Sequence, residues 1–144
     1  MITFVCTKQD LIPVDATGIR WLEPEADYAL ARAYWRGHGQ DLSRDIWEGA
    51  HASGYRYAAL VREGQILSSA AAWRYSDEAW EVAAVGTLEG FRRQGYATRV
   101  VAFVTAYILA SGRVATCHTD EDNVAMQATA RGVGFREVPE GRSR

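Results

Sequence analysis

Apolar positions recur at helical spacing in two early stretches of the chain, residues 24–36 and 42–52. Pro24 suits the first turn of a helix, because the amide N–H that it lacks would have no partner there. From residue 57 the pattern changes to runs typical of strands, over 57–62, 65–75 and 79–88. The spacing therefore predicts two helices followed by three consecutive strands.

The second half of the chain continues with a segment, 96–110, that is apolar on most of its surface and predicts a buried helix. A strand over 114–119, a helix from Asp122 or Asn123 to about Arg131, and a strand over 135–138 follow. Residues 1–16 have no clear place, although 2–6 could form a strand, and 19–22 read as another. We expect one α/β (α+β) domain over 1–144, with a mixed sheet between helices.

A basic turn, Arg92-Arg93-Gln94-Gly95-Tyr96-Ala97, stands between the third strand and the apolar helix. The N-terminus of a helix carries unpaired backbone N–H groups and the positive end of the helix dipole, so it favours an anion such as phosphate. Gly95 has no Cβ, which lets the backbone approach a ligand closely. A phosphate group would therefore lie over residues 92–98, although the same turn is also typical of an ordinary helix cap.

Composition narrows the function classes. The 144 residues are 48 % hydrophobic and 24 % charged, with a net charge of −2. A general nucleic-acid binder normally carries a basic surplus, so we expect no nucleic-acid partner. No apolar run has the length of a membrane span, so we expect no membrane partner either. Cys6 and Cys117 lie far apart, which argues against a metal site or a disulfide and favours free thiols in the cytoplasm.

The turn matches the pattern Arg/Gln-x-x-Gly-x-Gly/Ala, the pyrophosphate-binding motif of the GNAT N-acetyltransferases, as Arg92-x-x-Gly95-x-Ala97. Asn123 and the pair Gly134-Phe135 resemble the C-terminal motif of the same family. The resemblance is specific from about Trp80 to Phe135, and the N-terminal half is only compatible with it. It implies a splayed sheet with helices on both faces, acetyl-CoA as acyl donor, and no metal.

The resemblance implies that the donor lies along two backbone segments. The pyrophosphate would lie on residues 92–98, and the pantetheine arm would pair with residues 85–87 like an added strand. Gly86 would mark a bulge that opens the sheet for this arm, or merely a weak strand end. The residues predicted to bind acetyl-CoA are Val85, Gly86, Thr87, Arg92, Arg93, Gln94, Gly95, Tyr96, Ala97, Thr98 and Asn123.

Transfer to an amine needs a base, because an aliphatic ammonium has a pKa of about 10.4. Glu81 stands as far before Arg92 as the catalytic glutamate of family members that resemble histone acetyltransferases, so it is the predicted base. By period two it would share a strand face with Val85 and Thr87. His118 on the neighbouring strand is the second candidate, since imidazole titrates near neutral pH. Both side chains also suit plain structural roles.

One position departs from the family pattern. Many members carry a tyrosine on the last helix that protonates the leaving thiolate. Counting back from Gly134-Phe135, this chain has Ala130 there, and no tyrosine follows Tyr107. Water, Cys117 or His118 would then protonate the thiolate, or the chain would be a weak catalyst.

The acceptor is not readable from the sequence. Tyr28, Tyr34, Trp35 and Trp47 are available on the two N-terminal helices, but aromatic residues at helical spacing are usually core. The leading interpretation is acetyl transfer to an amine of a small molecule or peptide. The alternative is a catalytically weak acyl-CoA-binding or regulatory module of the same fold. A homodimer is left open.

Overall fold

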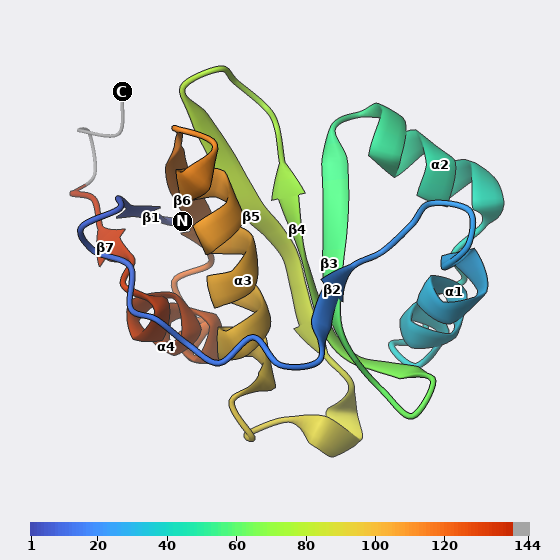
Figure 1. Ribbon diagram of the computed structural model, residues 1–144. Helices are drawn as coiled ribbons and strands as arrows, with labels where there is room; N and C mark the ends of the chain where they lie inside the picture. The colour runs from blue at the N-terminus through green and yellow to red at the C-terminus, as the bar shows by residue number, and fades with distance from the viewer. Residues whose placement is uncertain (140–144) are drawn as a thin grey trace.

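A mixed sheet of seven strands forms the centre of the molecule in the computed structural model, which describes residues 1–139 (Figure 1). Its elements are β1 (Ile2–Cys6), β2 (Ile19–Trp21), α1 (Tyr28–Arg36), α2 (Arg44–Ala52), β3 (Tyr55–Arg62), β4 (Gln65–Trp73), β5 (Ala79–Thr87), the 3-10 turn η1 (Glu89–Phe91), α3 (Tyr96–Ala110), β6 (Val114–Thr119), α4 (Val124–Val133) and β7 (Arg136–Glu137). The strand order is β2-β3-β4-β5-β6-β1-β7, and among the strands of the described residues only β5 and β6 pair in parallel. Residues 140–144 of the predicted domain lie outside the described residues.

Helices cover both faces of the sheet, as predicted. Along β3, Tyr57 and Ala59 pack with α1 and α2, whereas Ala58 and Leu60 pack with α3 on the other face. Helix α3 is buried nearly all round, and Val100 and Val104 are 0 % exposed. Within residues 1–139, no helix combines the length and the apolar character that crossing a membrane would require.

Helix α1 begins at Tyr28, later than the start at Pro24 that the sequence predicts. The carboxylate of Asp27 accepts a hydrogen bond from the Glu23 amide at 2.7 Å. It also accepts two from the guanidinium of Arg20 on β2, at 2.8 and 3.0 Å. This partly buried ion pair holds residues 24–27 as a turn against the sheet, which local sequence pattern does not reveal.

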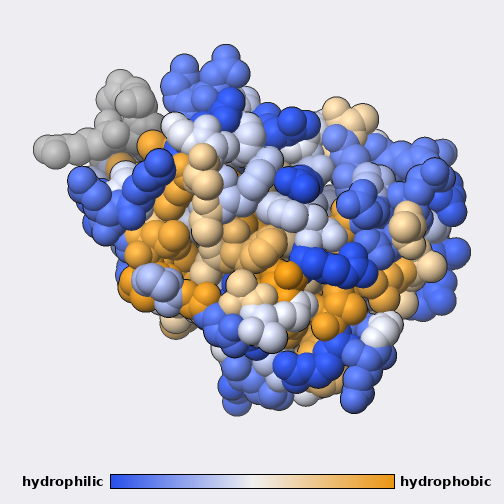
Figure 2. Space-filling view, viewed as in Figure 1, coloured by the Kyte–Doolittle hydropathy of each residue, from blue (hydrophilic) through white to orange (hydrophobic). Residues whose placement is uncertain are grey.

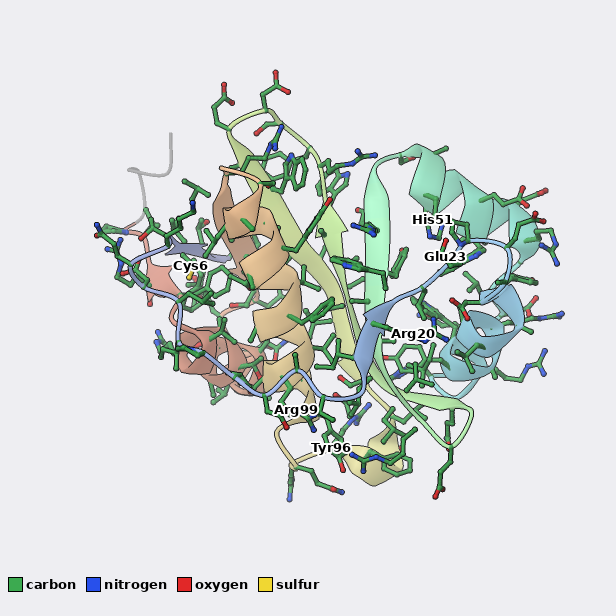
Figure 3. All side chains as sticks on the ribbon, viewed as in Figure 1. Cys6, Arg20, Glu23, His51, Tyr96 and Arg99 are labelled. Carbon is green, nitrogen blue, oxygen red and sulfur yellow. The ribbon has the colours of Figure 1, made fainter. Side chains whose placement is uncertain are left out.

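The N-terminal segment, which the sequence leaves unplaced, completes the sheet. Strand β1 lies between β6 and β7, and its Phe4 and Cys6 are 0 % exposed. The chain then crosses the outer side of α4 and α3 to reach β2 (Figure 1). Arg99 of α3 holds this crossing segment by donating from Nε to the Asp15 carbonyl oxygen at 3.0 Å (Figure 3).

An apolar groove of about 470 Å³ lies where the crossing segment meets α3. Figure 2 shows apolar side chains gathered on this side of the molecule. The groove is lined by Leu11, Ile12, Pro13, Val14, Ala16, Ala102, Phe103, Ala106 and Tyr107.

Strands β5 and β6 separate after a short ladder, so the sheet is splayed. In the described chain their pairing covers only residues 79–81 of β5 and 114–116 of β6. Beyond that point β5 continues to Thr87 and β6 to Thr119 without pairing with each other. The resulting opening is the feature that the family resemblance implies.

A bulge bends β5 away from β6. Ser69 of β4 pairs with Gly86 and Ala71 pairs with Ala83, so the single residue between them on β4 faces two on β5. The two residues on β5 are Ala84, which has a positive φ of 53°, and its successor Val85, so β5 has one extra residue here. The predicted bulge therefore exists, but it lies just before Gly86 and not at the glycine itself.

Candidate functional site

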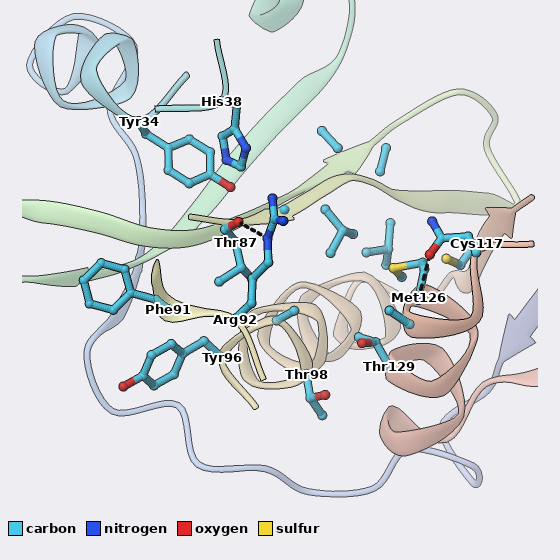
Figure 4. A pocket seen from close by; sticks show the side chains of 18 of the residues that line it. Tyr34, His38, Thr87, Phe91, Arg92, Tyr96, Thr98, Cys117, Met126 and Thr129 are labelled. Atoms are coloured by element: carbon cyan, nitrogen blue, oxygen red, sulfur yellow. Dashed lines mark hydrogen bonds between the residues drawn. The ribbon is translucent and has the colours of Figure 1, made fainter. Parts of the chain in front are cut away.

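The opening between β5 and β6 leads into a cleft of about 1060 Å³. Its walls come from β5, the loop before α3, the first turn of α3, β6, α4, and the end of α1 (Figure 4). Gln94 is the one predicted site residue that does not line the cleft within the described part of the chain. The others do: Glu81, Val85, Gly86, Thr87, Arg92, Arg93, Gly95, Tyr96, Ala97, Thr98, His118 and Asn123.

Helix α3 begins at the cleft with an unprotected first turn. Its N-cap is Gly95, and no side chain of the described residues caps the helix. Two other helices are capped: Ser43 Oγ accepts from the Ile46 amide, and Asn123 Oδ1 from the Met126 amide, both at 3.1 Å. The free N–H groups of α3 therefore face the cleft and can receive an anion.

The backbone before α3 is shaped to bring N–H groups together. Gly95 has φ 79° and ψ 8°, and Arg93 also has a positive φ of 66°. Successive turn residues of this kind form a concave surface of N–H groups that suits anions. A Cβ on Gly95 would meet no described atom within 4 Å, so the space beside the turn is open.

Arg92 and Asn123 also have contacts within the protein. The Nε of Arg92 donates to the Thr87 carbonyl oxygen at 3.1 Å, which folds the guanidinium back along β5 (Figure 4). Asn123 uses its side-chain oxygen to cap α4. Each residue therefore has a structural role beside the binding role that the motif predicts.

Glu81 and His118 meet across the two parallel strands. Nδ1 of His118 lies 3.0 Å from Oε1 of Glu81, and the side chains are 32 % and 19 % exposed. When Nδ1–H donates to the carboxylate, the other ring nitrogen, Nε2, is left free to accept a proton. The two predicted base candidates thus form one pair.

The expectation that Glu81 shares a face with Val85 and Thr87 is wrong. The bulge inserts one residue, so side chains that follow it exchange faces. Val85 packs into the core beneath α3, and the Thr87 hydroxyl lies 2.9 Å from that of Ser68. On the Glu81 face, the position after the bulge is Gly86.

Cys117 does not fit the role of acid. Burial raises the pKa of the Cys117 thiol to about 12, and the charge of Glu81 adds to this effect. A thiol leaving group has a pKa of about 8.5, so proton transfer to it from Cys117 would be uphill.

Ala130 does not open toward the cleft. It is 0 % exposed within the core, while Ala125, Met126 and Thr129 are the residues of α4 that line the cleft. A tyrosine at residue 130 would overfill that core.

The sequence does not predict the wall of the cleft that α1 and the following loop provide. The lining residues of this wall are Tyr34, Trp35, His38 and Gln40, of which the sequence marks only Tyr34 and Trp35 as available for substrate contact. Burial, followed by the charge of Arg92, lowers the pKa of His38. Local pattern gives no signal for His38 and Gln40, since they lie among glycines after the helix.

Comparison with known proteins agrees with this fold. The model of the Acetyltransferase (GNAT) family matches residues 19–135. A GNAT acetyltransferase from Novosphingobium aromaticivorans has a TM-score of 0.76 at 22 % identity, over 95 % of this chain and 59 % of that one. One from Colwellia psychrerythraea has a TM-score of 0.78 at 14 % identity, over 95 % and 52 %. The chain thus spans between half and three fifths of those two proteins.

A shorter neighbour is an aminoglycoside N-acetyltransferase, AAC(6')-Iy, whose structure contains a bisubstrate analogue of CoA and acetylneamine. Its TM-score is 0.62 at 23 % identity, over 88 % of this chain and 97 % of that one. No protein with a curated description matches the chain significantly. Because the family model covers most of the residues, this chain belongs to the GNAT acetyltransferase family.

Proposed function

We propose that the chain is an N-acetyltransferase that transfers an acetyl group from acetyl-CoA to a primary amine of a small molecule or peptide. The observation that carries the proposal is the uncapped N-terminus of α3, which opens into the same cleft as the Glu81–His118 pair. The first feature suits the pyrophosphate of the donor. The second suits the removal of a proton from an amine.

In the proposed reaction the acceptor nitrogen attacks the carbonyl carbon of the thioester. A C–N bond forms and the C–S bond breaks, so CoA leaves as a thiolate. Before the attack, the acceptor ammonium passes one proton to the Glu81–His118 pair, directly or through one water, which frees the lone pair of its nitrogen. A backbone N–H near the bulge, at residues 84–86, stabilises the carbonyl oxygen as it gains charge. The second proton, which the nitrogen loses as the amide forms, reaches the thiolate through water, since Cys117 is too weak an acid to supply one.

A second function rests on the missing acid. A chain without a positioned donor for the thiolate could bind acyl-CoA and turn it over poorly, as a regulatory module does. Loss of a general acid typically lowers the rate by about 10²–10⁴-fold. The low basicity of a thiolate puts the expected loss at the lower end, so we favour the enzyme.

Binding and turnover are tested separately. Thermal unfolding with acetyl-CoA should show stabilisation of about 2.7 kcal/mol at a hundred times the dissociation constant. Thiol release is then measured with polyamines, amino acids, aminoglycosides and lysine peptides, because the solved neighbour acts at an aminoglycoside. No stabilisation at millimolar acetyl-CoA would count against the proposal. Stabilisation without thiol release from any acceptor would favour the binding module.

A further inference from the structure

Two side-chain polar atoms beside the β5 bulge are buried without a well-formed hydrogen bond. Tyr34 of α1 is 4 % exposed, and its hydroxyl makes no hydrogen bond of good geometry within residues 1–139, although the Ser69 amide lies close enough to lower its pKa. Nε2 of His38, two residues beyond the helix, likewise has no hydrogen-bond partner within the described residues. Buried polar atoms normally find partners, so an unsatisfied pair in a cleft indicates a ligand that supplies them.

Gly86 is what lets these atoms reach the cleft. A Cβ at this position would lie 2.9 Å from the Tyr34 hydroxyl oxygen and 3.8 Å from His38 Nε2. The missing side chain of Gly86 therefore permits the close approach of a side chain from α1. It is not required by a positive φ at this position. Figure 4 shows both rings projecting toward the Thr87 end of β5, opposite Cys117 and Met126.

Both groups are neutral at neutral pH. Burial raises the pKa of Tyr34, although the Ser69 amide and the charge of Arg92 oppose the rise. Burial and the charge of Arg92 lower the pKa of His38. An uncharged, desolvated pair matches an uncharged polar group of the ligand. The pyrophosphate and the ammonium are better matched by the α3 N-terminus and by Glu81, respectively.

We propose that Tyr34 and His38 hydrogen-bond the uncharged acyl-pantetheine arm of acetyl-CoA from the α1 side of the cleft. The amide and thioester carbonyl oxygens of the arm can accept from a hydroxyl, and its amide N–H groups can donate to a free imidazole nitrogen. The inference rests on the proposed function. It adds a side-chain wall to an arm that otherwise meets the backbone of β5.

The test compares Tyr34→Phe with Tyr57→Phe. Tyr57 is also buried, at 7 % exposed, and packs in the same cluster, but it does not line the cleft. Calorimetry measures the dissociation constants of acetyl-CoA, CoA and 3′-phosphoadenosine 5′-diphosphate, which lacks the arm. His38→Leu, which removes the other proposed hydrogen-bonding group, is measured in the same way as a second variant.

Tyr34→Phe should weaken the binding of acetyl-CoA and CoA by about 3- to 10-fold, the usual effect of one hydrogen bond. The affinity for the nucleotide fragment should stay unchanged. The unliganded variant should unfold at the wild-type temperature or above, because the removed hydroxyl had no well-formed hydrogen bond. Tyr57→Phe should leave all three affinities unchanged.

Three results would overturn the inference alone: unchanged affinities, an equal loss for the fragment, or a fall in turnover with binding intact. A wild-type protein that binds none of the three ligands would instead overturn the proposed function, and the inference with it.

Discussion

At the scale of single residues, contacts between distant parts of the sequence assemble the proposed catalytic pair. Glu81 lies on β5 and His118 on β6, and their 3.0 Å contact needs the parallel register of the two strands. The family resemblance points to Glu81 through its spacing before Arg92, and its role as base stays a prediction. The pairing with His118 depends on which strands become neighbours, and no local pattern contains that information.

Glu81→Gln keeps the shape of the side chain and removes its basicity. We expect turnover to fall by about 10²–10⁴-fold with acetyl-CoA affinity nearly unchanged, because in the proposed reaction the carboxylate acts on the amine and not on the donor. Steady-state kinetics and calorimetry measure the two quantities.

His118→Ala is the matched variant for the same pair. A fall as large as that of Glu81→Gln would show that the two groups act as a unit, whereas a small fall would leave Glu81 as the base. Normal turnover in a folded Glu81→Gln protein would contradict both assignments and place the base elsewhere.

Elements with a strong periodic pattern follow from the sequence, and their tertiary adjustments do not. The apolar run of α3 predicts its bounds, Tyr96–Ala110, because its hydrophobic pattern is local. Helix α1 starts later than predicted because Asp27 binds Arg20 on β2. The bulge of β5 likewise reverses the faces of Val85 and Thr87, since one inserted residue changes the alternation. The basic turn at residues 92–97 was predictable because its motif is local. The wall of the cleft formed by α1 and the following loop was not, because it depends on tertiary contacts.

Gly95 and Gly112 flank α3 and permit a matched comparison. Both have a positive φ, 79° and 86°, and a Cβ at either would meet no described atom within 4 Å. A valine at either position should therefore lower the free energy of unfolding by at least about 1–2 kcal/mol through backbone strain. Only Gly95→Val should abolish CoA binding, because its side chain would occupy the space proposed for the pyrophosphate. Equal CoA affinity in the two folded variants would show that the anion does not bind at this turn.

Across the whole molecule, the N-terminal segment is joined to the acetyltransferase core. The family model begins at residue 19, yet β1 lies inside the sheet between β6 and β7. Strand β6 carries His118 on the face opposite Cys117, so β1 supports the strand that holds half of the proposed base. We propose that residues 1–17 fold in one cooperative unit with the remainder of the described chain.

Phe4→Ala tests this unity. Phe4 is 0 % exposed at the centre of β1 and packs in the main core, so its truncation should lower the free energy of unfolding by about 3–5 kcal/mol. Ile12→Ala is the control, because Ile12 belongs to the same segment but is 47 % exposed, and a surface change usually costs about 0.5 kcal/mol or less. Urea unfolding followed by circular dichroism and by tryptophan fluorescence should give one coincident transition for each protein. If Phe4→Ala cost no more than Ile12→Ala, or if the two signals separated, β1 would be an appendage and the cleft would not depend on it.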